Sequence, residues 1–267
     1  MTLSEIWIYP IKSLGGIRLH NATVYGKGLQ YDRRWMLVDQ AGVAMTQREY
    51  PDMALFKPAV DGEKISITFR RGDKIIATNS FDIGTCQTGK EIKGTVWGDH
   101  VSVQEVDTQL SDWFTHHLKT PCRLVAFPEP NARPVDPNYS INSEHVSLAD
   151  SYPFLVIGQG SLNDLNTRLA APVPMNRFRP NFVFTGGAPF AEDHWRDLSI
   201  GGIRFIAVKK SARCALTTVN QDTAEKGAEP LRTLSAYRKV GNKVFFGQNL
   251  VALNEGILTV GDALIPG

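Results

Sequence analysis

Short alternating segments bounded by turn residues run through most of this sequence, and they limit the chain to a β-rich fold. Apolar and polar residues alternate over only a few positions between clusters such as Asp61-Gly62 and Trp97-Gly98-Asp99. Such runs are typical of half-buried strands, and such clusters are typical of hairpin turns. Glycine (23) and proline (15) are numerous and spread along the chain. We therefore predict a mostly β (α+β) fold, a barrel or sandwich with a few short helices.

The pattern also predicts where the elements lie. The strands it predicts cover residues 4–9, 19–25, 34–39, 64–69, 74–78, 91–97, 101–106, 154–157, 181–185, 198–208, 214–219, 243–246, 250–254 and 256–260. Helices are expected over 108–118, 161–169 and 231–238. The first helix has the clearest signal, because Leu110, Phe114 and Leu118 recur at helical spacing and Asp107 or Thr108 can cap its start.

A polar, proline-rich stretch at 128–142 is the best candidate for a long loop. It suggests two lobes: an N-terminal β-rich lobe over residues 1–123 and a second domain over residues 124–267. Clefts between such units are common places for ligands, so we expect a binding site there.

Composition excludes several classes of function. Lysine plus arginine (29) nearly balances aspartate plus glutamate (27), so bulk charge predicts no nucleic-acid or membrane partner. Apolar runs are too short for a transmembrane helix, and the first residues lack a secretory signal pattern. Three distant cysteines, Cys86, Cys122 and Cys214, indicate a reducing compartment, so we expect a cytoplasmic protein. Without a C-x-x-C pair, we expect no zinc ribbon and no iron–sulfur cluster.

Three short segments could carry chemistry. Cys214 directly follows Arg213, whose positive charge favours the thiolate form; alternatively, it is a buried structural cysteine. Lys12 and Ser13 follow a strand that ends at Pro10, which suits an anion; alternatively, Lys12 is a solvated loop residue.

The third segment is Asn176–Asn181, where Arg177 and Arg179 flank a phenylalanine. Two planar guanidinium groups beside a strand can clamp an anion, or they can form surface ion pairs. The segment Asp32–Trp35 has a similar pattern. The six histidines form no metal motif, and the absence of G-x-S-x-G and G-x-G-x-x-G argues against a serine hydrolase or a Rossmann dehydrogenase.

These segments occur in the order of a known family. The matching stretches are WIYPIKS (7–13), DRRWMLV (32–38), DSYPFL (150–155), NDLN (163–166), FRPN (178–181), AEDHW (191–195), RCALTTV (213–219) and FGQN (246–249). The chain resembles MOSC-domain proteins with an N-terminal MOSC β-barrel region. That group includes the mitochondrial amidoxime-reducing component and bacterial YcbX-type molybdenum proteins. Eight stretches in register make the resemblance specific.

The resemblance implies a molybdenum cofactor, Mo-molybdopterin, with Cys214 as the protein ligand of the metal and the central catalytic residue. It implies that the pterin and its phosphate contact Lys12, Ser13, Arg33, Asp150, Ser151, Tyr152, Arg179, Asn181, Arg213 and Asn249. The residues themselves agree with this, since four of them are cations that would converge on one anionic ligand.

The implied activity is reduction of N-hydroxylated compounds, such as amidoximes, hydroxylamines and N-hydroxylated nucleobases, to an amine or amidine and water. Electrons would come from a separate ferredoxin-like protein or flavin reductase, because the chain has no cluster cysteines. Asp193, His194 or a bound water could supply the proton. The alternatives are a non-catalytic molybdopterin or sulfur carrier of the MOSC type, and a chain that has lost the cofactor.

Two departures from the family pattern affect the site. Ala212 stands where relatives can have serine, which removes one hydroxyl. Residues 220–224 read NQDTA where the family usually shows V-D-P-x-T-G. We expect that loop near the mouth of the cofactor site, so the substrate range is open.

Overall fold

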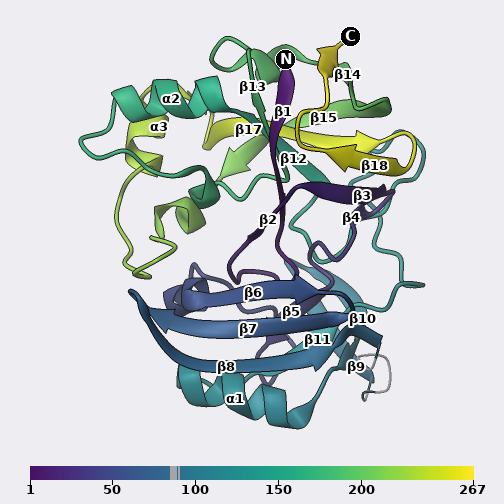
Figure 1. Ribbon diagram of the computed structural model, residues 1–267, viewed down its shortest axis with the longest axis vertical. Coiled ribbons are helices and arrows are strands. Elements are labelled where there is room, and N and C mark those ends of the chain that lie inside the picture. Colours follow the sequence, from purple (N-terminus) through teal and green to yellow (C-terminus); the bar gives the residue numbers. More distant parts are fainter. Residues whose placement is uncertain (85–88, 90) are drawn as a thin grey trace.

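The computed structural model describes residues 1–84, 89 and 91–267 of the chain. Two lobes lie one above the other along the long axis of the molecule (Figure 1). Both lobes are built mainly of strands, with short helices at their outer surfaces. The predicted mostly β fold with few helices is therefore confirmed.

The upper lobe contains a nine-stranded sheet in the order β19-β14-β15-β17-β12-β13-β1-β2, with β16 paired to β17. Its strands are β1 (Thr2–Ile8), β2 (Ile17–Leu19), β12 (Phe154–Gly158), β13 (Phe182–Thr185), β14 (Asp197–Ile200), β15 (Ile203–Arg213), β16 (Lys239–Val240), β17 (Lys243–Ala252) and β19 (Leu264–Pro266). A small sheet beside it joins β3 (Asn21–Tyr25), β4 (Gly28–Leu29) and β18 (Gly256–Thr259).

The first strand, β1, pairs with a strand from the other side of the predicted division of the sequence. Thr2 and Ile6 of β1 pair with Thr185 and Phe182 of β13, so the start of the chain completes the upper sheet. In Figure 1 the purple N-terminal strand stands among the green and yellow strands, and β2 leads down toward the lower lobe. The division into 1–123 and 124–267 stays a prediction.

The lower lobe contains a four-stranded sheet, β5-β11-β10-β9, and a three-stranded sheet, β6-β7-β8. Their strands are β5 (Trp35–Val38), β6 (Phe56–Asp61), β7 (Lys64–Arg71), β8 (Lys74–Asp82), β9 (Glu91–Val96), β10 (Asp99–Glu105) and β11 (Arg123–Ala126). Helix α1 (Thr108–Leu118) lies at the bottom of this lobe, beneath β8 (Figure 1).

Helix α1 occupies the predicted residues, because its start is capped locally. The side chain of Asp107 accepts hydrogen bonds from the backbone N–H groups of Gln109 and Leu110, at 2.6 and 3.2 Å. The other helical segments are α2 (Gln159–Thr167), α3 (Leu231–Tyr237) and the short 3₁₀ turns η1 (Pro51–Leu55), η3 (Met175–Arg177), η4 (Ala191–His194) and η5 (Ala215–Thr218).

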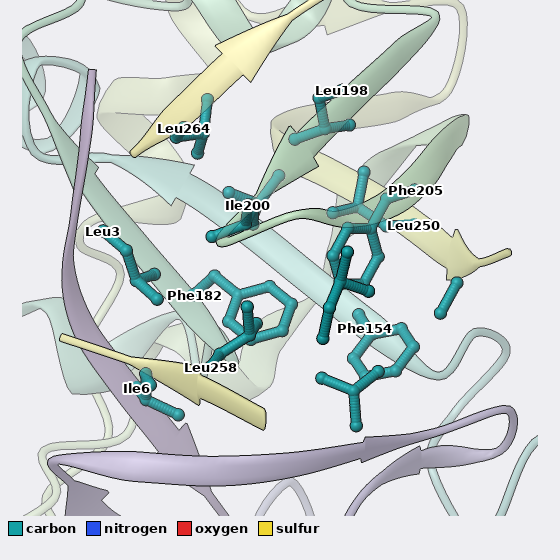
Figure 2. Close-up of a cluster of buried hydrophobic side chains, with 14 of the residues drawn as sticks. Leu3, Ile6, Phe154, Phe182, Leu198, Ile200, Phe205, Leu250, Leu258 and Leu264 are labelled. Atoms are coloured by element: carbon teal, nitrogen blue, oxygen red, sulfur yellow. The ribbon is translucent and has the colours of Figure 1, made fainter. Parts of the chain in front are cut away.

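Each lobe has its own apolar core. In the upper lobe, Phe154, Phe182 and Phe205 pack at centroid distances of 5.5 to 5.6 Å, with Leu3 and Ile6 of β1 beside them (Figure 2). Burying one such side chain contributes about 1.5–3 kcal/mol. The lower core is centred on Phe56, which stacks on Phe69 at 4.5 Å. The largest apolar cluster of each lobe is built mainly from that lobe's own strands, as expected for two units that each bury a core.

Three strand predictions are corrected by the structure. The segments 243–246 and 250–254, predicted as separate strands, are joined in the single strand β17, which ends at Ala252. The predicted strand over 198–208 is two strands, β14 and β15, because Gly201 and Gly202 make a turn with φ of 54° and 83°. The predicted strand over 214–219 is wrong, since the chain turns into η5 directly after Cys214. Thr217 and Thr218 have β-branched side chains, but their hydroxyls donate to backbone carbonyls three residues back, which stabilises the turn.

Residues 127–153, all of them described, contain no strand beyond an isolated bridge between Pro134 and His145. The predicted long loop at 128–142 is therefore confirmed. Within the part of the chain that the structure describes, no helix has the length and apolar character to cross a membrane.

Candidate cofactor site

A pocket of about 320 Å³ opens where the upper sheet meets the segments that lead to the lower lobe. Its walls come from the β1–β2 and β4–β5 connections, the loop before β12, the approach to β13, and strands β15 and β17. All of the residues that the family resemblance implies as metal or cofactor contacts line it: Lys12, Ser13, Arg33, Asp150, Ser151, Tyr152, Arg179, Asn181, Arg213, Cys214 and Asn249.

Positive charge dominates the lining. The cationic side chains are Lys12, Arg33, Arg179, Lys209, Lys210, Arg213 and Lys243, against the carboxylates of Asp136 and Asp150. Sequence reasoning missed Lys209, Lys210 and Lys243, because lysines on strands are usually solvated and no motif marks them. A pocket with this surplus of positive over negative side chains is suited to an anionic ligand.

Lys12 is buried rather than solvated, with only 5% of its surface exposed. Its Nζ donates to the carbonyl of Leu148 at 2.8 Å and forms an ion pair with Asp150. Burial lowers the pKa of Lys12, and the charge of Asp150 opposes that shift. The ammonium group has three donors, so one remains for a ligand in the pocket.

Arg33 and Arg179 both lie against the ring of Tyr9, with guanidinium carbons 4.2 and 4.1 Å from its centroid. Arg33 also donates to Asp32 at 2.6 Å and to the carbonyl of Arg179 at 3.2 Å. Arg179 donates to the carbonyl of Leu14 at 2.7 Å. Burial lowers the pKa of Arg179 to about 10, and the charge of Arg33 contributes in the same direction.

The backbone is strained at three of these positions. Ser13, Arg33 and Arg179 have φ values of 65°, 50° and 55°, in the left-handed region that non-glycine residues rarely adopt. Each such residue costs on the order of 1 kcal/mol, and such strain clusters at functional sites. Each of the three side chains lines the pocket, so the strained backbone is part of how the site is formed.

Cys214 is an exposed free thiol at the end of β15, which rules out a buried structural role. Its neighbour Arg213 donates to the carbonyl of Phe178 at 2.6 Å and to the hydroxyl of Ser211 at 2.9 Å. Burial lowers the pKa of Arg213, while Cys214 opposes that shift. The buried Nε of Arg213 has no hydrogen-bond partner in the protein, so a donor remains beside the thiol.

Asp32 organises the site, although sequence analysis assigned it no role. It is 1% exposed, and its carboxylate accepts hydrogen bonds from the backbone N–H of Tyr9 at 2.7 Å, from Asn181 at 3.0 Å and from Arg33. The amide of Asn181 also contacts backbone groups of Trp7 and Leu155, so it shapes the wall of the pocket. The only sequence signal was an acid placed directly before two arginines.

Three other candidates lie outside the lining. Arg177 is buried and donates to the carbonyls of Thr217 and Glu229, so it supports the structure. Asp193 and His194, the suggested proton donors, do not line the pocket either. Asp193 forms ion pairs with Lys210 and Arg238, at 3.2 and 2.5 Å.

The fold and site define a β-rich protein with an anion pocket beside an exposed thiol, and both halves match known domain families. Residues 1–121 match the MOSC N-terminal beta barrel domain, and residues 143–265 match the MOSC domain. The chain belongs to the MOSC family, in the group that carries both domains.

Curated relatives narrow the comparison. The chain is 33% identical to human mitochondrial amidoxime-reducing component 1, over 98% of this chain and 81% of that protein. It is 33% identical to the bovine mitochondrial amidoxime reducing component 2, over 89% of this chain and 72% of that protein. It is also 30% identical to a rice molybdenum cofactor sulfurase, over 92% of this chain but 32% of that protein.

The pocket residues fit a molybdenum cofactor. Among the described residues, no group of three or more His, Cys, Asp and Glu could hold a metal ion. Molybdopterin brings two dithiolene sulfurs and a phosphate. The surplus of cations would offset its negative charge, the unpaired Arg213 Nε could donate to it, and Cys214 offers the soft ligand that the metal takes beside the pterin sulfurs.

The other cysteines give a test of this assignment. Cys122 is buried in the lower lobe, where burial raises the pKa of its thiol, and its backbone N–H donates to Thr115 at 3.0 Å. Cys86 lies outside the described residues. We expect the double variant Cys86→Ala/Cys122→Ala to keep wild-type molybdenum content, measured by elemental analysis of protein with an unchanged circular dichroism spectrum. Loss of the metal from this folded variant would contradict the assignment of Cys214 as the protein ligand of molybdenum.

Proposed function

We propose that this chain is a molybdenum-cofactor-dependent reductase of N-hydroxylated compounds. The observation that carries the proposal is the convergence of the exposed Cys214 thiol and buried cations from distant segments on one pocket. The human relative is named for amidoxime reduction, which supports the same reading. When bound, the cofactor supplies two-electron redox chemistry at molybdenum.

The residues of the chain divide into two groups in this proposal. Cys214 holds the metal and tunes its potential. Lys12, Arg33, Arg179 and Arg213 hold the phosphate and pterin by charge-assisted hydrogen bonds. The remaining lining positions, which provide hydroxyl, amide and carboxylate groups, are Ser13, Asp150, Ser151, Tyr152, Asn181 and Asn249.

The overall reaction breaks the N–O bond of the substrate. Two electrons and two protons are consumed, an N–H bond forms, and the oxygen leaves as water. We propose that the electrons come from a separate protein, a ferredoxin-like carrier or a flavin reductase. Since Asp193 and His194 lie away from the lining, the protons would reach the substrate through solvent in the pocket.

The second candidate is a non-catalytic carrier of molybdopterin or sulfur. The similarity to a molybdenum cofactor sulfurase favours this carrier role. The chain spans about a third of the length of that protein. A bound cofactor is expected under both proposals, so occupancy does not separate them. Reduction of benzamidoxime with an artificial donor such as reduced methyl viologen does.

The decisive experiment therefore has two stages. Protein expressed in a host that makes the cofactor is analysed for molybdenum and pterin, and the loaded protein is then assayed with benzamidoxime. Benzamidine formation supports the reductase. Full occupancy with no turnover supports the carrier, and absence of both metal and pterin contradicts both proposals.

The buried cations should control cofactor retention. Replacing Lys12 or Arg179 with alanine removes a charge-assisted contact worth roughly 1.5–3 kcal/mol. Affinity for the pterin should then fall about ten- to a hundredfold. Because burial lowers the pKa of Lys12, we expect its contact to weaken at a lower pH than that of an ordinary lysine.

Retention is measured as pterin per protein after dialysis over a pH series. Arg71→Ala is a matched control, since Arg71 pairs with Asp52 on the exposed surface of the lower lobe and does not line the pocket. Equal pterin content in the control and in the Lys12 and Arg179 variants would show that these cations do not hold the cofactor.

A further inference from the structure

Trp97 is a large aromatic residue on the protein surface, with 59% of it exposed. It lies in the tight turn between β9 and β10, in the lower lobe. Its φ is 62°, a conformation that is unfavourable for a bulky side chain and that asparagine or glycine adopts more easily. Neither the fold nor the proposed cofactor contacts require an exposed indole at this turn.

The turn is fixed to the loop that lines the pocket. The side chain of Trp97 helps to lower the pKa of Asp150, a carboxyl group that lines the pocket and pairs with Lys12. The buried Arg133 forms a second link, because its Nε contacts Asp99 at 2.7 Å and its Nη2 donates to the carbonyl of Asp150 at 3.0 Å. The turn that carries Trp97 is therefore tied, through Asp99 and Arg133, to the loop that lines the pocket.

Trp97 is also connected, through Arg48, to the segment that follows residues 220–224, where this chain departs from the family pattern. The guanidinium of Arg48 lies 4.0 Å from the centroid of the Trp97 ring. The carbonyl of Arg48 accepts a hydrogen bond from Lys226 at 2.6 Å, at the end of the 220–226 loop. Gln47 connects the same loop to the pocket, since it bonds both Gln221 and the carbonyl of Ser13.

We propose that Trp97 is a substrate-positioning residue, an aromatic platform at the pocket rim on which planar N-hydroxylated compounds stack. This inference rests on the proposed reductase function and names the substrate class of the site. Aryl amidoximes and N-hydroxylated nucleobases have a flat π face that an indole can hold. Hydroxylamine has no ring, so it gains nothing from the platform.

The test compares two substrates and two variants of the cofactor-loaded protein. Trp97→Asn removes the ring and suits the left-handed turn, so the variant is expected to fold; Trp97→Phe keeps an aromatic face. With reduced methyl viologen as donor, we expect Trp97→Asn to raise the KM for benzamidoxime about tenfold with little change in kcat. The kcat/KM for hydroxylamine should stay within about twofold, and Trp97→Phe should resemble the wild type.

A matched control is Ile75→Asn, which removes an apolar side chain of similar exposure (58%) from β8, away from the pocket lining. It should change neither KM. Pterin content is measured in every variant, because Trp97 helps to lower the pKa of Asp150, which lines the pocket. If Trp97→Asn lowered kcat/KM equally for benzamidoxime and hydroxylamine, or lowered it for neither, the proposed role of Trp97 would be wrong.

Binding gives a readout that does not depend on turnover. Benzamidoxime should quench part of the indole fluorescence of the wild type, and that part should be missing in Trp97→Phe. If the wild type reduces neither substrate, the proposed function fails, and this titration alone decides the role of Trp97. Quenching that persists unchanged in Trp97→Phe contradicts the proposal.

Discussion

Replacing Cys214 with alanine is expected to abolish the reduction of N-hydroxylated compounds while most of the pterin remains bound. Under the proposed function, Cys214 would contribute one sulfur to the metal, whereas the cations on the pocket wall would hold the phosphate and pterin. Changing groups that merely orient metal ligands costs roughly 10- to 100-fold in activity. Loss of the ligand itself should lower turnover per bound pterin by at least about a hundredfold.

The measurement is turnover divided by pterin content, with molybdenum determined on the same samples. Cys122→Ala is the matched control, because it removes the buried thiol in the lower lobe, which does not line the pocket. It should keep wild-type turnover per pterin. If Cys214→Ala keeps it as well, Cys214 is not the working ligand and the reductase proposal loses its central residue.

Replacing Asp32 with alanine is expected to produce the largest loss of stability. Asp32 is 1% exposed, and its carboxylate bonds Arg33, Asn181 and the backbone of Tyr9 together. Removing one partner of a buried ion pair leaves the other charge uncompensated and costs about 3–5 kcal/mol. Arg33 and Asn181 would also lose their positions, so pterin retention should fall with stability.

The free energy of unfolding is measured by urea titration of the cofactor-free protein, which separates stability from ligand binding. Asp52→Ala is the matched control, since Asp52 pairs with Arg71 at 2.7 Å on the exposed surface and should contribute less than about 1 kcal/mol. Asp32→Asn keeps the size of the side chain and one acceptor oxygen. Its loss of unfolding free energy should lie between those of Asp32→Ala and Asp52→Ala. Equal effects of Asp32→Ala and Asp52→Ala would contradict the organising role of Asp32.

The sequence was most informative where structure depends on neighbouring residues. Helix α1 begins and ends where its apolar spacing and the Asp107 cap predicted. The hairpin turn at Trp97-Gly98 was also predicted, because turn chemistry is local. Local reasoning failed at 214–219, where a strand was predicted but the hydroxyls of Thr217 and Thr218 stabilise a 3₁₀ turn.

The predicted cofactor contacts came from motifs that occur in family order, and all of those contacts line one pocket. What the motifs could not give is burial. From the sequence, Lys12 could be either an anion ligand or a solvated loop residue. Arg177 and Arg179 were both predicted to clamp an anion, with nothing to distinguish them. The structure separates the last two, since Arg179 lines the pocket and Arg177 binds the carbonyls of Thr217 and Glu229.

By itself, the sequence determined the β-rich class, the capped helix, the long loop and the set of motif residues. Tertiary structure alone decided that β1 completes a sheet with β13, that Asp32 is the shared buried acceptor, and that Lys209, Lys210 and Lys243 join the pocket. The reason is physical. Strand alternation and capping depend on contacts within a few residues, whereas pairing and desolvation depend on segments that become neighbours only when the chain packs.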